Sequence, residues 1–160
     1  MEKPFKEISL RRMRWLLFLL SYFKIPLIGF VRPRLQVLND NECSVLIPLR
    51  RRSKNHLNSM YFGALAIGAD LSGGLHAFYF SECRKLKIAL AFKDVNAKFL
   101  KRAESDILFK STDGALIKSA LDQSIESGTR INQPISIKAL NTDDELVAEF
   151  ILTVSIKVIQ

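Results

Sequence analysis

The stretch NHLNSMYFGALAIGADLSGGLHAFYF, from Asn55 to Phe80, decides the fold of this 160-residue chain. It is too long for one strand, and its large apolar residues recur at helical spacing, so it predicts an apolar helix. Asn55, Asn58 and Ser59 are the residues that could cap its start. Each glycine inside a helix costs about 1 kcal/mol relative to alanine, so its glycines indicate that other backbone packs closely against it. These glycines are Gly63, Gly68, Gly73 and Gly74.

Segments on both sides of this helix alternate between apolar and polar residues, as strands do. One-sided alternation is typical of an antiparallel sheet with one covered face. Strands are expected within 35–50 (two, joined at 39–41), 85–93, 106–111, 131–140 and 146–159, and a second helix over 114–127. We therefore expect an α+β fold in which one antiparallel β-sheet wraps around a central apolar helix.

Length and composition favour a single domain. A chain of 160 residues with 48% hydrophobic content can bury a substantial core. No repeat or flexible linker marks a boundary, so we expect one domain over 1–160, with an N-terminal helical segment at 1–28 and the core at 29–160. Cys43 and Cys83 lack the spacing of a disulfide framework or a metal site. This favours a reducing, cytoplasmic location without a metal or cofactor.

The net charge of +8 suggests an acidic or phosphorylated partner. The basic residues are scattered and no nucleic-acid-binding motif accompanies them, so we expect no nucleic acid partner. The N-terminal run RRMRWLLFLLSYFKIPLIGFV has an uncharged core, Trp15 to Phe23, that is much shorter than the about 20 residues of a membrane-spanning helix. It is either an additional helix that packs on the domain or a helix that lies on a membrane surface.

Asp70 is the only formally charged side chain between Lys54 and Glu82. Burial of a carboxylate raises its pKa unless charges or hydrogen bonds compensate. Asp70 could have a structural role, capping a loop or pairing with a lysine of the sheet. It could instead face a pocket as a general base or nucleophile. The residues alone leave both interpretations open.

The positions of Asn55, Gly63 and Asp70 resemble a motif of the hotdog-fold acyl-thioester hydrolases. In the phenylacetate-degradation type the motif is N-x-x-G-x-x-H-G-G, followed seven residues later by an aspartate. Asn55, Gly63 and Asp70 match its first residue, its last glycine and the aspartate. The whole chain, including its N-terminal helix, looks still more like a thioesterase-like branch of the hotdog superfamily. The resemblance implies a hotdog fold and an acyl-thioester hydrolase, with acyl-CoA or an acyl-carrier-protein thioester as substrate.

The same resemblance implies roles for individual residues. The backbone N–H of Phe62 or Gly63 would polarise the thioester carbonyl, Asn55 would position water or the carbonyl, and Asp70 would be the general base or nucleophile. The sequence departs from the motif at three positions: the first glycine is Asn58, the histidine is Tyr61 and the second glycine is Phe62. With Ser59, Asn58 and Tyr61 are expected to contact the substrate. A backbone donor survives a change of side chain, but the bulk of Phe62 would reshape the acyl entrance.

Helix geometry adds an expectation about assembly. Phe62 and Asp70 are eight residues apart, which is about 12 Å along a helix. One thioester carbon cannot contact both within one chain. The site is therefore expected at a two-fold interface of a homodimer, or of a dimer of dimers, as the resemblance also implies.

A basic cluster, Arg50, Arg51, Arg52 and Lys54, leads directly into Asn55. It is either a solvated loop or a site for the phosphates of coenzyme A or for an acidic carrier protein. His56 and His76 lie too far apart for an obvious metal pair. Two alternatives to hydrolysis stay open: a non-catalytic protein that binds acyl-CoA or lipid, and a membrane-peripheral protein that uses its N-terminal helix.

Overall fold

The structure is a computed structural model and describes residues 7–159. Among these residues, no helix is long and apolar enough to cross a membrane. The elements follow the chain in the order α1 (Leu10–Leu19), the π-helix η1 (Leu20–Lys24), α2 (Pro26–Phe30), β1 (Arg34–Leu38), β2 (Cys43–Ile47), α3 (Phe62–Arg84), β3 (Lys87–Phe99), β4 (Ile107–Ser111), α4 (Gly114–Ser127), β5 (Ile131–Leu140) and β6 (Leu146–Ile159).

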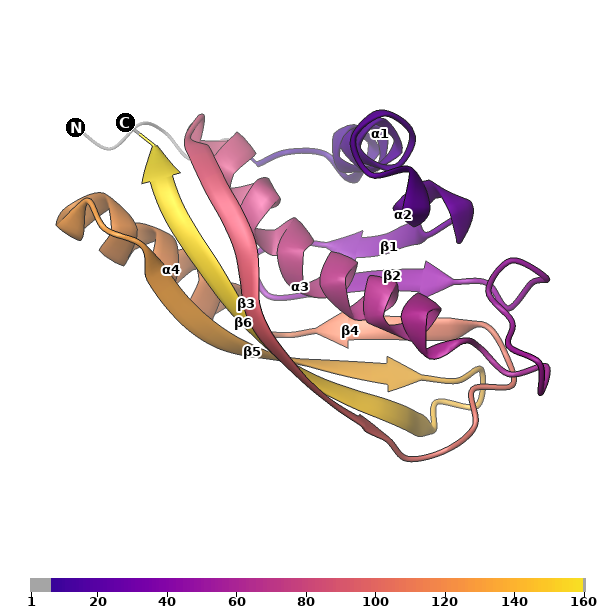
Figure 1. Cartoon of the computed structure of the whole chain (residues 1–160). Helices are drawn as coiled ribbons and strands as arrows, with labels where there is room; N and C mark the ends of the chain where they lie inside the picture. Colours follow the sequence, from indigo (N-terminus) through magenta and orange to yellow (C-terminus); the bar gives the residue numbers. More distant parts are fainter. Residues whose placement is uncertain (1–6, 160) are drawn as a thin grey trace.

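The six strands form one antiparallel sheet in the order β1-β2-β4-β5-β6-β3. The sheet curves around α3, and the N-terminal helices lie near the β1 edge (Figure 1). Strands β1 and β3 are thus the two opposite edges. The expected α+β architecture, an antiparallel sheet around a central apolar helix with an additional N-terminal helix, is confirmed.

The core lies between α3 and the concave face of the sheet. Phe109, Ile137, Phe150 and Val154 point inward from the strands and are buried. Gly68 shows why α3 needs glycine: a Cβ at this position would lie 2.2 Å from the ring of Phe109. The expectation that other backbone packs closely against these glycines is wrong, because the atoms nearest to a Cβ at each glycine of α3 belong to side chains.

The N-terminal segment packs on this domain through one side only. Ser9 is the N-cap of α1, and its Oγ accepts a hydrogen bond from the backbone N–H of Arg12 at 3.3 Å. Met13, Leu17 and Ile28 are buried against the core. The opposite side carries large apolar side chains that stay exposed.

Two boundaries differ from the sequence-based expectations. Helix α3 begins at Phe62, its N-cap is Tyr61, and no side chain caps it. The expected caps Asn55, Asn58 and Ser59 instead belong to the preceding loop. Strand β3 continues to Phe99 rather than ending near residue 93, because its second half still pairs with β6. That half is exposed on both faces, so the alternation that reveals a half-buried strand is missing.

Candidate active site

The loop before α3 is organised by Asn55. Its side-chain Oδ1 accepts hydrogen bonds from the backbone N–H groups of Leu57 at 2.9 Å and Ser59 at 3.1 Å. Asn58 adopts a left-handed conformation with φ of 60°, which asparagine tolerates better than most residues. With Oδ1 used in this way, the side-chain Nδ2 donates to no residue within 7–159, so an amide donor remains for a ligand.

Arg102, which is distant in the sequence, stabilises this loop through hydrogen bonds. Its Nη2 donates to the backbone oxygen of Leu57 at 2.6 Å, and its Nε donates to Ser59 Oγ at 3.0 Å. The N–H of Met60 also donates to the backbone oxygen of Ala103 at 2.7 Å. Sequence reasoning missed Arg102, because nothing in its own surroundings signals a contact with residues more than 40 positions earlier.

The first turn of α3 presents free backbone donors. Ala64 and Leu65 both donate to the backbone oxygen of Tyr61, whereas the N–H groups of Phe62 and Gly63 have no acceptor within the described part of the chain. The ring of Tyr61 packs against Gly63, where a Cβ would lie 2.5 Å from the ring. A helix start of this kind carries partial positive charge. The donors can therefore stabilise an oxygen that gains negative charge.

Asp70 lies two turns further along α3 and is half-buried. No residue from 7 to 159 forms a hydrogen bond or an ion pair with its carboxylate, so neither structural role considered above, a loop cap or a pairing with a sheet lysine, is present in the chain. Burial raises the pKa of Asp70 to about 6. An unpaired carboxylate with such a pKa is suited to accept a proton near neutral pH.

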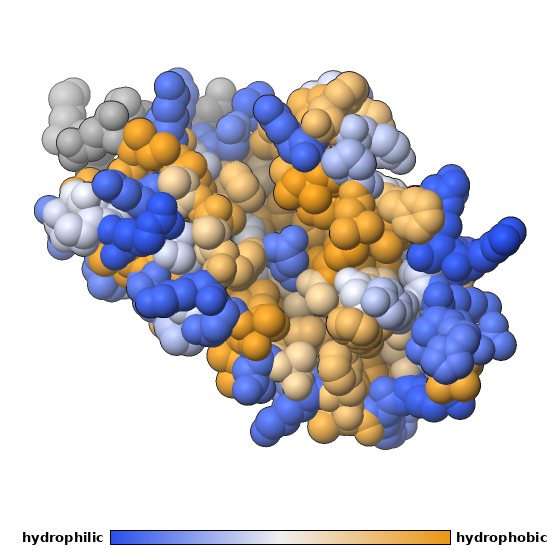
Figure 2. All heavy atoms as spheres, viewed as in Figure 1, coloured by the Kyte–Doolittle hydropathy of each residue, from blue (hydrophilic) through white to orange (hydrophobic). Residues whose placement is uncertain are grey.

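Phe62, Ala66 and Asp70 follow one another at intervals of four residues and so lie on one side of α3. This side is not covered by the chain's own sheet, and the Phe62 side chain is 61% exposed. Figure 2 shows apolar atoms along this side of α3, continuing to the N-terminal helices. The uncovered stripe thus connects the free donors with the carboxylate.

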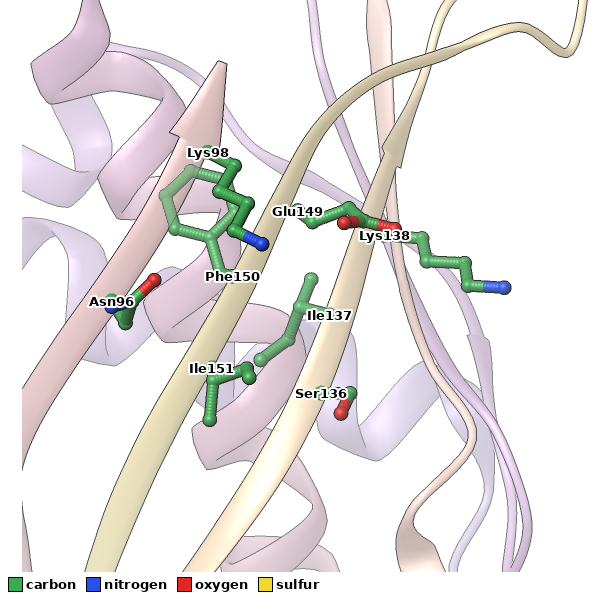
Figure 3. A pocket seen from close by; sticks show the side chains of 8 residues that line it. All are labelled: Asn96, Lys98, Ser136, Ile137, Lys138, Glu149, Phe150 and Ile151. Carbon is green, nitrogen blue, oxygen red and sulfur yellow. The ribbon is translucent and has the colours of Figure 1, made fainter. Parts of the chain in front are cut away.

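Two hollows lie elsewhere in the structure. One of about 230 Å³ is formed by β3, β5 and β6, where Lys98, Lys138 and Glu149 point away from α3 (Figure 3). Another of about 510 Å³ lies between the N-terminal helices and β1. Asp70 lines neither hollow. Neither of these two hollows is therefore the proposed site of Asp70.

The four residues of the basic cluster differ in their contacts. Arg50 forms an ion pair with Asp106 at 3.4 Å, and Asp106 also accepts the N–H of Leu49 at 2.8 Å. Arg52 lies over the ring of Phe30, with 5.2 Å to its centroid. Arg51 and Lys54 form no ion pair with any residue that the structure describes. Two exposed cations beside the Asn55 loop are thus available to an anionic ligand.

The two histidines do not form a metal site. His76 is buried, and its Nε2 lies 3.1 Å from the backbone oxygen of Asn39. Desolvation lowers its pKa. His56 is exposed in the loop before α3. Within the described range of the chain, no three His, Cys, Asp or Glu side chains group together as metal ligands would.

Comparisons with known proteins agree with this architecture. Residues 13–156 match the family described as "Domain of unknown function (DUF4442)". A Pseudomonas aeruginosa structure described as a protein of unknown function and probable thioesterase is 22% identical, with a TM-score of 0.78, covering 98% of this chain and 100% of its own. A Haemophilus influenzae thioesterase is 14% identical, with a TM-score of 0.71, covering 96% of this chain and 94% of its own. No curated protein matches the sequence. These similarities establish the hotdog fold of thioesterase-like proteins.

Proposed function

The chain belongs to the family described as "Domain of unknown function (DUF4442)" and has the hotdog fold, and from these premises we propose that it hydrolyses acyl thioesters. The observation that carries the proposal is Asp70. This carboxylate has no partner among residues 7–159, has a pKa raised to about 6, and lies on the uncovered side of the helix that offers the free N–H groups of Phe62 and Gly63. Acyl-CoA is the substrate class that we favour, with a carrier-protein thioester as the other source.

Each group has a defined task in this chemistry. Asp70 takes a proton from water as the water oxygen attacks the thioester carbon, or its carboxylate attacks that carbon directly. The carbonyl oxygen becomes negatively charged and is stabilised by the N–H of Phe62 or Gly63. When the tetrahedral intermediate collapses, the carbon–sulfur bond breaks, and on the water route the leaving thiolate takes up the proton that Asp70 accepted. On the direct route the acyl group stays on Asp70 as an anhydride, which water then hydrolyses to the free acid and the regenerated carboxylate. The Nδ2 of Asn55 orients the water or the carbonyl.

A homodimer supplies the geometry that one chain lacks. Phe62 and Asp70 are about 12 Å apart along α3, so we infer that the carboxylate of one protomer acts with the helix start of its partner. Strand β3 offers a means of assembly: it has 13 residues, and among residues 7–159 it pairs only with β6. A long free edge of this kind is a template for strand pairing. The assembly is then a homodimer or a dimer of two such dimers.

Arg51 and Lys54 are placed to bind the phosphates of coenzyme A or an acidic carrier protein. Both are exposed, neither forms an ion pair in the described chain, and both lie in the loop that leads into Asn55. Asn58, Ser59 and Tyr61 complete the proposed substrate contacts. Of these, Ser59 is already bound to Arg102 and contributes mainly to the shape of the loop.

A non-catalytic acyl-binding protein is the second candidate, favoured by one observation. The rings of Tyr61 and Phe62 pack at a centroid distance of 4.7 Å and remain exposed. They stand where the resembling hydrolases have histidine and glycine. Two aromatic rings at this point add apolar surface for an acyl chain and narrow the approach to the N–H donors.

The decisive experiment measures free thiol released from acyl-CoAs of several chain lengths by the wild type and by Asp70→Asn. Hydrolysis predicts release by the wild type that the variant loses while its oligomeric state is unchanged. Thermal stabilisation by acyl-CoA in both proteins, without thiol release from any substrate, would instead establish the acyl-binding function.

A further inference from the structure

The N-terminal helices carry a continuous exposed aromatic face. Helix α1 and η1 bury Met13, Leu17 and Ser21, so this face is left unused by the fold. Phe23 is 73% exposed and Leu27 is 64% exposed. The rings lie in a row: Trp15 and Phe18 are stacked with centroids 5.3 Å apart, and Phe18 and Tyr22 are tilted with centroids 4.6 Å apart. We define the N-terminal face as Trp15, Phe18, Tyr22, Phe23, Leu27 and Phe30.

Basic residues flank this face in the sequence, and all but one of them have no acidic partner in the described chain. The sequence contains no acidic residue between Glu7 and Asp40. Within residues 7–159, only Arg12 of the basic side chains in this interval forms an ion pair, with Glu82 at 2.9 Å. The others are Arg11, Arg14, Lys24, Arg32 and Arg34, and all five are exposed. An apolar face bordered by unpaired cations is complementary to an anionic bilayer surface.

The hollow beside the face places cationic and apolar groups together. It has a volume of about 510 Å³, and Arg14, Arg32 and Arg34 line it together with Phe18 and Tyr22. Ser21 also lines it, and its buried Oγ has no hydrogen-bond partner in the described chain. Guanidinium groups bind phosphate oxygens well. The hollow thus fits a lipid phosphate whose acyl chains lie among the aromatic rings.

The position in the fold keeps this face accessible. Its neighbour β1 is at one edge of the sheet, and β3 is at the opposite edge. A dimer formed through β3 would use the sheet edge opposite to the one beside the N-terminal helices. We propose that the N-terminal face docks this protein on anionic phospholipid membranes, with the aromatic side chains at headgroup depth and the arginines against lipid phosphates. This proposal does not depend on thioester hydrolysis.

Trp15 provides a direct readout, because it is the only tryptophan of the chain and is 58% exposed. The full-length protein is mixed with vesicles of phosphatidylcholine and phosphatidylglycerol at a ratio of about 3:1, and with pure phosphatidylcholine vesicles as the comparison. We expect co-sedimentation with the anionic vesicles, a blue shift of Trp15 emission, and quenching by lipids brominated near the headgroup. Raising the salt concentration should weaken binding.

Double substitutions on the N-terminal face, each matched by a control elsewhere on the surface, distinguish a loss of membrane binding from a loss of folding. Phe23→Ser with Leu27→Ser should lower partitioning at least about tenfold, whereas Leu116→Ser with Ile125→Ser, exposed on α4, should not. Arg11→Glu with Arg34→Glu should lower partitioning by a similar factor, and Lys138→Glu with Lys157→Glu should not. Equal losses in test and control variants, or no binding to anionic vesicles, would overturn the proposal. So would a Trp15 shift that follows protein concentration without lipid, because a second copy would then cover the face.

Discussion

Among single residues, Asp70 allows a test through the pH dependence of catalysis. Because burial raises its pKa to about 6, the active carboxylate form increases as the pH rises through that value. We expect kcat/KM for acyl-CoA hydrolysis to rise with slope one on a logarithmic plot below about pH 6 and to level off above it. Asp70→Asn should lower the rate by about 10²- to 10⁴-fold and remove the inflection. A wild-type profile that is flat between about pH 5 and 8, on both sides of the expected inflection, would contradict this role.

The same residue should make the fold less stable at neutral pH. The folded protein holds the Asp70 proton up to about pH 6, whereas the unfolded chain releases it near the ordinary pKa of 3.8. The unfolded state therefore binds fewer protons in this window, so the free energy of unfolding falls as the pH rises and the loss is complete above about pH 6.

Asp70→Asn should consequently stabilise the protein by about 1 to 3 kcal/mol at pH 8 and by much less at pH 4. Denaturant unfolding at the two pH values measures the difference. Asp143→Asn, on an exposed loop, is the control and should show no such dependence. An Asp70→Asn variant that is less stable than the wild type at pH 8 would mean that the carboxylate has a stabilising partner.

At the scale of elements, the glycines of α3 differ in how much space surrounds them: some leave no room for a side chain and others do. A Cβ on Gly68 would lie 2.2 Å from the Phe109 ring, whereas a Cβ on Gly74 would have its nearest neighbour at 3.5 Å. Gly68→Ala should destabilise the protein by about 1 to 3 kcal/mol through overpacking. Gly74→Ala should be neutral or stabilising by up to about 1 kcal/mol, since alanine is the better helix former. Thermal unfolding of both variants checks the contrast, and equal effects would show that packing against the sheet does not set the requirement.

The start of α3 can be tested without disturbing the helix. Proline is tolerated at the first helical position, and Tyr61, with φ of −61° and ψ of 139°, already has the conformation favoured before proline. Phe62→Pro removes one backbone donor and should lower kcat by about 10²- to 10³-fold. Phe62→Ala keeps the N–H and should retain most of kcat. If both variants lose activity equally, the side chain and not the backbone donor is what matters.

The sequence predicted those helices and strands in which apolar residues recur at the spacing of a helix or a strand. The glycine-rich helix, the alternating strands and the unusual carboxylate could all be recognised from local patterns. The end of β3 could not, because both of its faces are exposed there and no alternation exists. Arg102 and Asp106 hold the loop before α3 through contacts across more than 40 residues, and such contacts leave no local signal. The caps of α3 were misjudged because Asn55 bonds within its own loop, a competition that is common for asparagine.

At the scale of the whole molecule, the proposed two-fold site predicts complementation between inactive variants. Asp70→Asn lacks the carboxylate and Phe62→Pro lacks the donor. If each site combines the Asp70 of one protomer with the Phe62 N–H of its partner, a mixed dimer contains one complete site. After unfolding and refolding together in equal amounts, half of the dimers are mixed and each has one complete site of two, so about a quarter of the wild-type activity should return. If both groups acted within one chain, every site in the mixture would lack one of them and no activity would return. Size-exclusion chromatography of the same mixture shows whether dimers have formed, which separates a failure of assembly from a failure of the shared-site geometry.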